Sequence, residues 1–229
     1  MPKMRPSPKD ISLKPWHLPG FTVVELLVVV AIIGSLIGIA IPLAAQARAS
    51  ANEMICKSNL RQLYAAVLEY SQDNRGLIPP AYVAPVTWSS ALLDGKYLLG
   101  TEIAPGDIRN EALGCPQQRL VVGDRLMRTY SFNAHIGTGD RKFTTLVSPS
   151  RTLLIADGNY VAGRTPPYNI SLVAGSILPT AAHPNEKGTI NCLFGDGHVE
   201  SRSNEDTDEG VPRGVGAPGS SRYLFWTGR

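Results

Sequence analysis

The sequence lacks the short motifs by which many enzymes and cofactor-binding proteins hold their chemistry. No glycine-rich phosphate loop, no nucleophile elbow and no paired-cysteine zinc motif occurs in its 229 residues. It has four histidines, three cysteines and no evident internal repeat. These absences predict a protein that is not an enzyme and that needs no cofactor.

Charged side chains are also scarce, at 18% of the chain, and they are unevenly placed. Residues 1–20 contain four basic side chains and one acidic, a net charge of +3, so residues 21–229 keep 18 of the 22 basic and 18 of the 19 acidic groups. The balanced remainder gives no support for a nucleic-acid partner. The basic excess at the start predicts a cytoplasmic N-terminal flank by the positive-inside rule.

A long apolar run follows the basic stretch. It covers the 23 residues from Phe21 to Leu43 and contains one charged side chain, Glu25. A helix of this length rises about 35 Å, enough to cross a hydrocarbon layer of about 30 Å. A helix is also the form that satisfies its own backbone groups in lipid. Because an acidic side chain is costly there, Glu25 indicates a functional role.

The junction GFTVVE at residues 20–25, between a basic stretch and an apolar helix, resembles the type IV pilin and pseudopilin family. The resemblance implies that a prepilin peptidase cleaves after Gly20 and methylates the new N-terminal Phe21. It also implies that Glu25 guides the packing of subunits into a filament. A carboxylate in lipid needs a partner, and the amino group of Phe21 on a neighbouring subunit is a cation at matching depth.

The expected fold is α+β and pilin-like, with a long N-terminal helix, transmembrane and then amphipathic, packed on a small antiparallel β-sheet. The resemblance implies a helix kink at Pro42, since proline lacks an N–H group and clashes one turn back. The expected parts are a cleaved basic leader (1–20), a transmembrane half-helix (21–43), an amphipathic half-helix (44–75), a globular α+β domain (76–202) and a flexible C-terminal tail (203–229). Within this tail, the apolar residues 223–226 are expected to dock back on the domain as a hydrophobic anchor.

The periodicity predicts how the amphipathic half-helix packs. One stripe of mostly apolar residues recurs at steps of three and four, and its members are Cys56, Leu60, Leu63, Tyr64, Val67, Leu68 and Ser71. Gly76 is expected to cap the end of this helix. A short helix is expected within residues 88–99, in an otherwise loop-rich region. Strands are expected at 129–134, 152–156, 189–194 and 198–201, the last two joined by a turn at 195–197.

Four segments resemble one bacterial branch of the same family. They are residues 56–62, Cys115 with Pro116, residues 129–133, and His183 followed by residues 194–200. In the last segment, His183, Asp196 and His198 could converge with Asp157 on a divalent metal. Histidines suit calcium poorly and Asp-Gly pairs commonly form turns, so we favour turns here over a metal site.

Three cysteines cannot all pair with one another. A bridge between Cys56 and Cys115 would tie the domain to its helix, and closing a loop of about 60 residues is worth about 4 kcal/mol in the chain-entropy model. Cys192 lies in an apolar strand and is expected to be a buried free thiol. Connectivity is not fixed by sequence, so this pairing is a hypothesis.

The resemblance implies a structural subunit of a type IV pilus-like or type II secretion pseudopilus filament. The expected location is the bacterial inner membrane, single-pass, with the C-terminal domain periplasmic before assembly. The expected partners are prepilin peptidase, identical or homologous pilin subunits, the filament assembly machinery and the inner membrane. Two alternatives stay open: a membrane-anchored periplasmic metal-binding or enzymatic module, and a soluble periplasmic protein cleaved after Ala47, where residues 45–47 read A-x-A.

Overall fold

A computed structural model of the chain describes residues 20–83, 86–104, 107–117, 129–138, 140–157, 171–172, 188–203, 207, 218 and 220–229. Its internal contacts divide the chain into two compact units, Met1–Ala45 and Gln46–Arg229. Apart from Gly20, the leader predicted at residues 1–20 lies outside the described residues, and so does His183.

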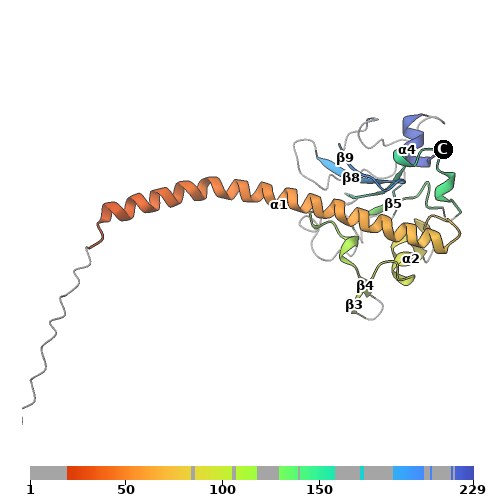
Figure 1. Ribbon diagram of the computed structural model, residues 1–229, viewed down its shortest axis with the longest axis horizontal. Coiled ribbons are helices and arrows are strands. Elements are labelled where there is room, and N and C mark those ends of the chain that lie inside the picture. Colours follow the sequence, from red (N-terminus) through yellow and green to blue (C-terminus); the bar gives the residue numbers. More distant parts are fainter. Residues whose placement is uncertain are drawn as a thin grey trace, which may run out of the picture. The chain divides into compact units, whose positions relative to one another are not determined.

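Helix α1, Val23–Asp73, contributes residues to both units (Figure 1). It continues through Pro42 without a break, and the kink expected there stays a prediction. The helix ends in a Schellman-type turn, in which the Gly76 N–H donates to the Ser71 carbonyl at 2.7 Å. Arg75, with φ of 57°, takes the left-handed position that we expected Gly76 to supply, while Gly76 follows at φ of 83°.

The described part of the first unit is the apolar half of α1 with the few residues before it. Every one of these described residues is exposed. By length and composition, α1 contains a segment that is apolar enough to cross a membrane. In this unit, therefore, the described helix contributes apolar surface without burying it.

The second unit is built on a five-stranded sheet with the strand order β7-β5-β6-β8-β9. Its strands are β5 (Ser131–Asn133), β6 (Leu153–Ala156), β7 (Ser171–Leu172), β8 (Thr189–Phe194) and β9 (Val199–Ser203). Neighbouring strands pair antiparallel, except that β5 and β7 are parallel. A long helix with a small, largely antiparallel sheet is thus confirmed, and the parallel edge pair is a departure from the expected sheet.

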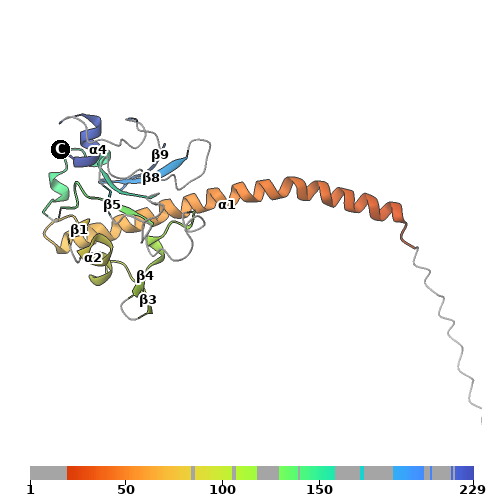
Figure 2. The same cartoon turned by 180° about the vertical axis from the view of Figure 1, so that it is seen from behind.

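The sheet lies between α1 and the short helix α4, Ser221–Thr227 (Figures 1 and 2). Side chains alternate between the two faces of a strand. On β8, Leu193 belongs to the core that contains Leu60 and Leu63 of α1. Its neighbours point the other way, into a second cluster whose members are Leu153, Ala156, Ile190, Cys192, Phe194, Phe225 and Trp226.

The end of the chain is a packed helix. Phe225 and Trp226 of α4 are 3% and 2% exposed. The Asn133 side-chain amide donates to the Trp226 carbonyl at 2.9 Å, and Arg141 donates to the Thr227 carbonyl at 2.8 Å. The docking expected for residues 223–226 is thus confirmed. For residues 220–229 the flexible tail predicted over 203–229 is wrong, because burying two aromatic rings offsets the entropy cost of ordering a short segment.

The remaining elements lie in the first half of the domain and before β6. They are β1 (Tyr82–Val83), β2 (Val86–Thr87), α2 (Trp88–Asp94), β3 (Thr101–Ala104), β4 (Asp107–Arg109), η1 (Glu111–Leu113), η2 (Phe143–Thr145) and η3 (Pro149–Arg151). The short helix expected within residues 88–99 is α2, and its Trp88 and Leu92 are fully buried. The hairpins β1–β2 and β3–β4 are too short and too rich in proline for their periodicity to be read from sequence.

Candidate functional site

The start of α1 is held by reciprocal hydrogen bonds between Thr22 and Glu25. The N–H and the hydroxyl of Thr22 donate to Oε2 of Glu25 at 2.9 and 2.8 Å, and the N–H of Glu25 donates to the Thr22 hydroxyl oxygen at 3.2 Å. This arrangement is a capping box, which satisfies backbone donors that the first helical turn leaves open. The Thr-x-x-Glu spacing predicts this capping box, which was not among our predictions from the sequence.

Gly20 and Phe21 precede this cap in non-helical, exposed chain, and the Phe21 side chain is 72% exposed. The bond at which cleavage is expected therefore lies outside the helical hydrogen-bond ladder. A peptidase needs an accessible backbone that is free to take an extended form, and the position of this bond meets that requirement.

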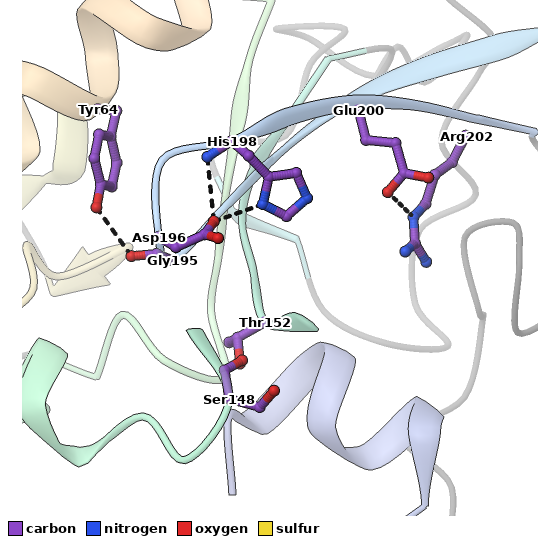
Figure 3. Close-up of polar contacts among 8 residues, drawn as sticks. All are labelled: Tyr64, Ser148, Thr152, Gly195, Asp196, His198, Glu200 and Arg202. Atoms are coloured by element: carbon purple, nitrogen blue, oxygen red, sulfur yellow. Dashed lines mark hydrogen bonds and ion pairs between the residues drawn. The ribbon is translucent and has the colours of Figure 1, made fainter. Parts of the chain in front are cut away.

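Asp196 and His198 lie at the turn between β8 and β9 (Figure 3). Gly197 has a φ of +91°, and a Cβ there would lie 2.3 Å from the ring of Tyr64. The Tyr64 hydroxyl donates to the Gly195 carbonyl at 3.1 Å. The turn thus packs directly on α1, and glycine at 197 is required both by the backbone conformation and by the space available.

The Asp196 carboxylate stabilises the turn through contacts with His198, two residues later. It accepts a hydrogen bond from the His198 N–H at 3.2 Å and lies 2.6 Å from Nδ1 of the same residue. Burial alone would raise the pKa of the Asp196 carboxyl, but the hydrogen bonds from the side chain and backbone of His198 outweigh it, and the pKa lies below its usual value. The His198 ring stacks on Phe194, with centroids 4.4 Å apart and planes 2° apart.

Neighbouring contacts tie this turn to the rest of the sheet. The guanidinium of Arg202 lies 5.0 Å from the ring centroid of Phe194, and its Nε lies 3.2 Å from a Glu200 carboxylate oxygen (Figure 3). The Gly195 N–H donates to the Thr152 carbonyl at 2.9 Å, and the Thr152 hydroxyl donates to the Ser148 carbonyl at 2.8 Å. All these contacts are explained by a structural role, which is to hold the turn on the sheet.

The metal site considered in the sequence analysis is not assembled by the described residues. Among them, one group of three His, Cys, Asp or Glu side chains has donor atoms close enough for a metal, and it consists of Cys56, Cys115 and Asp157. Asp157 is therefore not grouped with Asp196 and His198 in the described part of the chain. His183, the third residue of the predicted set, lies outside it.

Cys56 and Cys115 form a disulfide, which confirms the predicted pairing. Their Cα atoms are 5.0 Å apart and the residues are separated by 59 positions in sequence. Both cysteines are fully buried. The Tyr130 hydroxyl donates to the Cys56 carbonyl at 3.2 Å, and the Cys115 N–H donates to the Thr129 hydroxyl at 2.6 Å. Cys192 is a buried free thiol, as expected.

A buried carboxylate lies next to this disulfide. Asp157 follows β6 and is 0% exposed. The backbone N–H of Asn191 donates to its Oδ1 at 2.8 Å and the Asn191 side-chain amide donates to its Oδ2 at 2.9 Å. Asp157 was expected to be part of a turn, but its side chain has a specific partner, Asn191, on β8.

The hydrogen bonds continue from Asn191 toward α1. The Ser201 hydroxyl lies 2.7 Å from Oδ1 of Asn191 and 3.1 Å from a carboxylate oxygen of Glu53. Glu53 pairs with Lys57 at 2.7 Å, one helical turn along α1. A polar network thus joins α1, β9, β8 and the end of β6. The sequence offers little signal for it, because its members are distant in sequence and lie on different elements.

Comparison with known proteins finds no family model, no curated protein and no solved structure that matches this chain.

Proposed function

We propose that the chain is a structural subunit of a filament of the type IV pilus or type II secretion pseudopilus class. Before assembly, the apolar half of α1 anchors it in a bacterial inner membrane. The observation that carries the proposal is the exposure of this half, where side chains such as Leu36 and Ile39 are 62% and 70% exposed. A continuous apolar surface of this length is unfavourable in water, and it needs lipid or other helices around it.

Two glycines in the same stretch favour other helices as the surface that covers it. Apart from adjacent residues and the nearby backbone of α1 itself, a Cβ added at Gly34 or Gly38 would meet no described atom within 4 Å. Residues four apart lie on one face of a helix, and two small residues at this spacing let a neighbouring backbone approach closely. The glycines therefore support close packing between the α1 helices of neighbouring subunits.

Glu25 supplies the specific contact in this proposal. Its carboxylate caps its own helix through Thr22. In an apolar surrounding it also needs a cationic partner, and the amino group of Phe21 on a neighbouring subunit provides one once residues 1–20 are removed. The pairing fixes the depth of one helix relative to the next. The proposed partners are prepilin peptidase, other pilin-like subunits and an assembly machinery.

The first test is the mass of the N-terminal peptide of the protein purified from its own membranes. The proposal expects a peptide that begins at Phe21 and carries one N-methyl group. A chain that begins at Arg48 would indicate a soluble periplasmic protein released by cleavage after Ala47. A retained Met1 would indicate a plain membrane anchor, and either result contradicts the proposal.

A second test addresses assembly. Glu25→Ala should leave membrane insertion unchanged and lower filament recovery by about tenfold or more, because it leaves a neighbour's ammonium group unpaired in apolar surroundings. Glu69→Ala, on an exposed position of α1 in the second unit, is the matched control and should assemble normally. Incorporation of Glu25→Ala at the control level would remove Glu25 from the proposed role.

A further inference from the structure

The buried disulfide and the carboxylate beside it form an unusual local arrangement in the second unit. A carboxylate oxygen of Asp157 and the Sγ atoms of Cys56 and Cys115 all lie within 4.8 Å of one another. All three residues are 0% exposed. At this separation and in a buried site, a negative charge acts strongly on any second charge that forms on sulfur.

The Asp157 side chain is held rigidly in this position. Asn191 donates one hydrogen bond to each of its two oxygens, at 2.8 and 2.9 Å. These two bonds fix the side chain in one orientation. Ser201 in turn contacts the Asn191 amide oxygen at 2.7 Å and so orients it. The sheet therefore presents a fixed carboxylate to the two sulfurs.

We propose that Asp157 protects the disulfide between Cys56 and Cys115 from exchange with thiols, because its buried carboxylate disfavours the thiolate that must form when the S–S bond opens. The thiols concerned are low-molecular-weight or protein thiols in the surroundings of the domain. This role does not depend on the proposed filament function, since it concerns the integrity of the second unit alone.

The chemistry of exchange shows where the carboxylate acts. The thiolate of an attacking dithiol bonds to Sγ of one cysteine, the S–S bond breaks, and its electron pair leaves on the other cysteine as a thiolate that then takes a proton. The second sulfur of the dithiol, as a thiolate, displaces the first cysteine in the same way. The dithiol is oxidised to a cyclic disulfide and both cysteines are reduced. A nearby negative charge makes each cysteine a poorer leaving group.

The third cysteine is kept out of this exchange by two features. Cys192 points into the cluster with Phe194 and Trp226, whereas Cys56 and Cys115 belong to the core on the α1 face. Burial, and next the charge of Asp157, raise the pKa of the Cys192 thiol, with a lowering effect from Arg202 and a further raising effect from Glu200. A protonated thiol is a poor nucleophile, so Asp157 also disfavours rearrangement to a Cys192 pairing.

The test follows reduction of the disulfide in the full chain, purified in detergent. Dithiothreitol is added under native conditions, samples are alkylated over time, and mass spectrometry counts labels on Cys56 and Cys115. Asp157→Asn removes the charge and is expected to speed reduction by about tenfold. Asp157→Ser removes the same charge with a smaller side chain and is expected to behave alike, so the test does not depend on one variant folding.

Asn191→Ala is the matched control, because it removes a hydrogen bond to Asp157 and keeps the charge. A second readout is the pH at which the reduced, folded protein is alkylated on Cys56 and Cys115, which Asp157→Asn should lower by about one unit and Asn191→Ala should not. The nearby charged groups Glu53 and Lys57 on α1, and Glu200 and Arg202 on β9, are the same in all variants. Two results would overturn the proposal. One is an equal rate of disulfide reduction in wild type and Asp157→Asn, and the other is an equal acceleration of reduction in Asp157→Asn and Asn191→Ala.

Discussion

The two halves of α1 share one backbone and have opposite surroundings. The described residues of the first unit are all exposed, although this half is the more apolar. In the second half, seven side chains are buried: Cys56, Asn59, Leu60, Leu63, Ala66, Val67 and Ser71. Burial therefore follows the partner surfaces that the chain itself supplies, which here are a sheet and its loops. In the proposed function, the apolar half finds its partners in lipid or in other subunits.

The largest expected effect on stability comes from removing the disulfide, which links the second half of α1 to the domain. Cys56→Ser should lower the free energy of unfolding by about 4 kcal/mol, since the loop it opens spans 59 positions. Denaturant unfolding of the second unit in detergent measures it. Cys192→Ala is the control, because it removes a buried thiol and leaves the disulfide intact. Equal losses in the two variants would show that the crosslink is not what stabilises this half.

The next largest effect comes from replacing one leucine by alanine in each half of α1. Leu63 is 0% exposed and Leu36 is 62% exposed. Leu63→Ala should destabilise the domain by about 3 kcal/mol, because it leaves a cavity, whereas Leu36→Ala should leave domain stability unchanged. The same unfolding measurement checks both. A comparable loss for Leu36→Ala would mean that the apolar half does support the domain, and the contrast between the halves would fail.

A pair of glycines gives a smaller effect. At Gly197, an added Cβ would lie 2.3 Å from the Tyr64 ring and the φ is +91°, so Gly197→Ala should cost about 2 kcal/mol. At Gly34 such a Cβ would meet no described atom within 4 Å apart from adjacent residues and the nearby backbone of α1, so Gly34→Ala should leave the domain unaffected. Thermal unfolding of the domain separates the two. A Gly197→Ala protein as stable as Gly34→Ala would show that the turn does not pack on Tyr64 in solution.

Much of the second unit was predictable because its signals are local. Strand β8 begins and ends at the predicted residues, Thr189 and Phe194, since an apolar run followed by a Gly-Asp-Gly turn has few other solutions. The helix end and the stripe that contains Leu60 and Leu63 follow from turn chemistry and a period of 3.6 residues. The disulfide was inferred as a hypothesis from the position of Cys56 on that stripe, and the structure confirms it.

Other features depend on partners distant in sequence. The docking of Trp226 needs an amide from Asn133, 93 positions earlier, and the burial of Asp157 needs Asn191, 34 positions later. A single sequence does not say which polar residues will meet across a sheet, because the two-residue period gives the face and not the partner. The apolar residues 223–226 therefore predicted that the tail docks, but not which residues it docks on. The cap formed by Thr22 and Glu25 was predictable from the Thr-x-x-Glu spacing, although Glu25 was interpreted only as an assembly residue.

The smallest expected effect concerns Asp196, in the turn that packs on the second half of α1. Its pKa is lowered in the folded state, so its ionised form contributes stability that is present above the pKa of the unfolded chain, about 4, and is lost as pH falls through the folded pKa. Asp196→Asn should therefore cost less than about 1 kcal/mol at pH 6, because the side chain is 39% exposed and solvent screens the contact.

As the pH falls below about 4, this difference between wild type and Asp196→Asn should shrink toward zero, and urea unfolding across the acid range measures it. Glu69→Gln, on an exposed part of α1, controls for the loss of one surface charge. A difference that stays constant with pH would assign the stability to the shape of the Gly-Asp-Gly turn instead of the carboxylate. The Tyr64 contact alone would then carry the attachment of this turn to α1, and Tyr64→Phe, which removes the hydroxyl bonded to Gly195, would become the sharper probe.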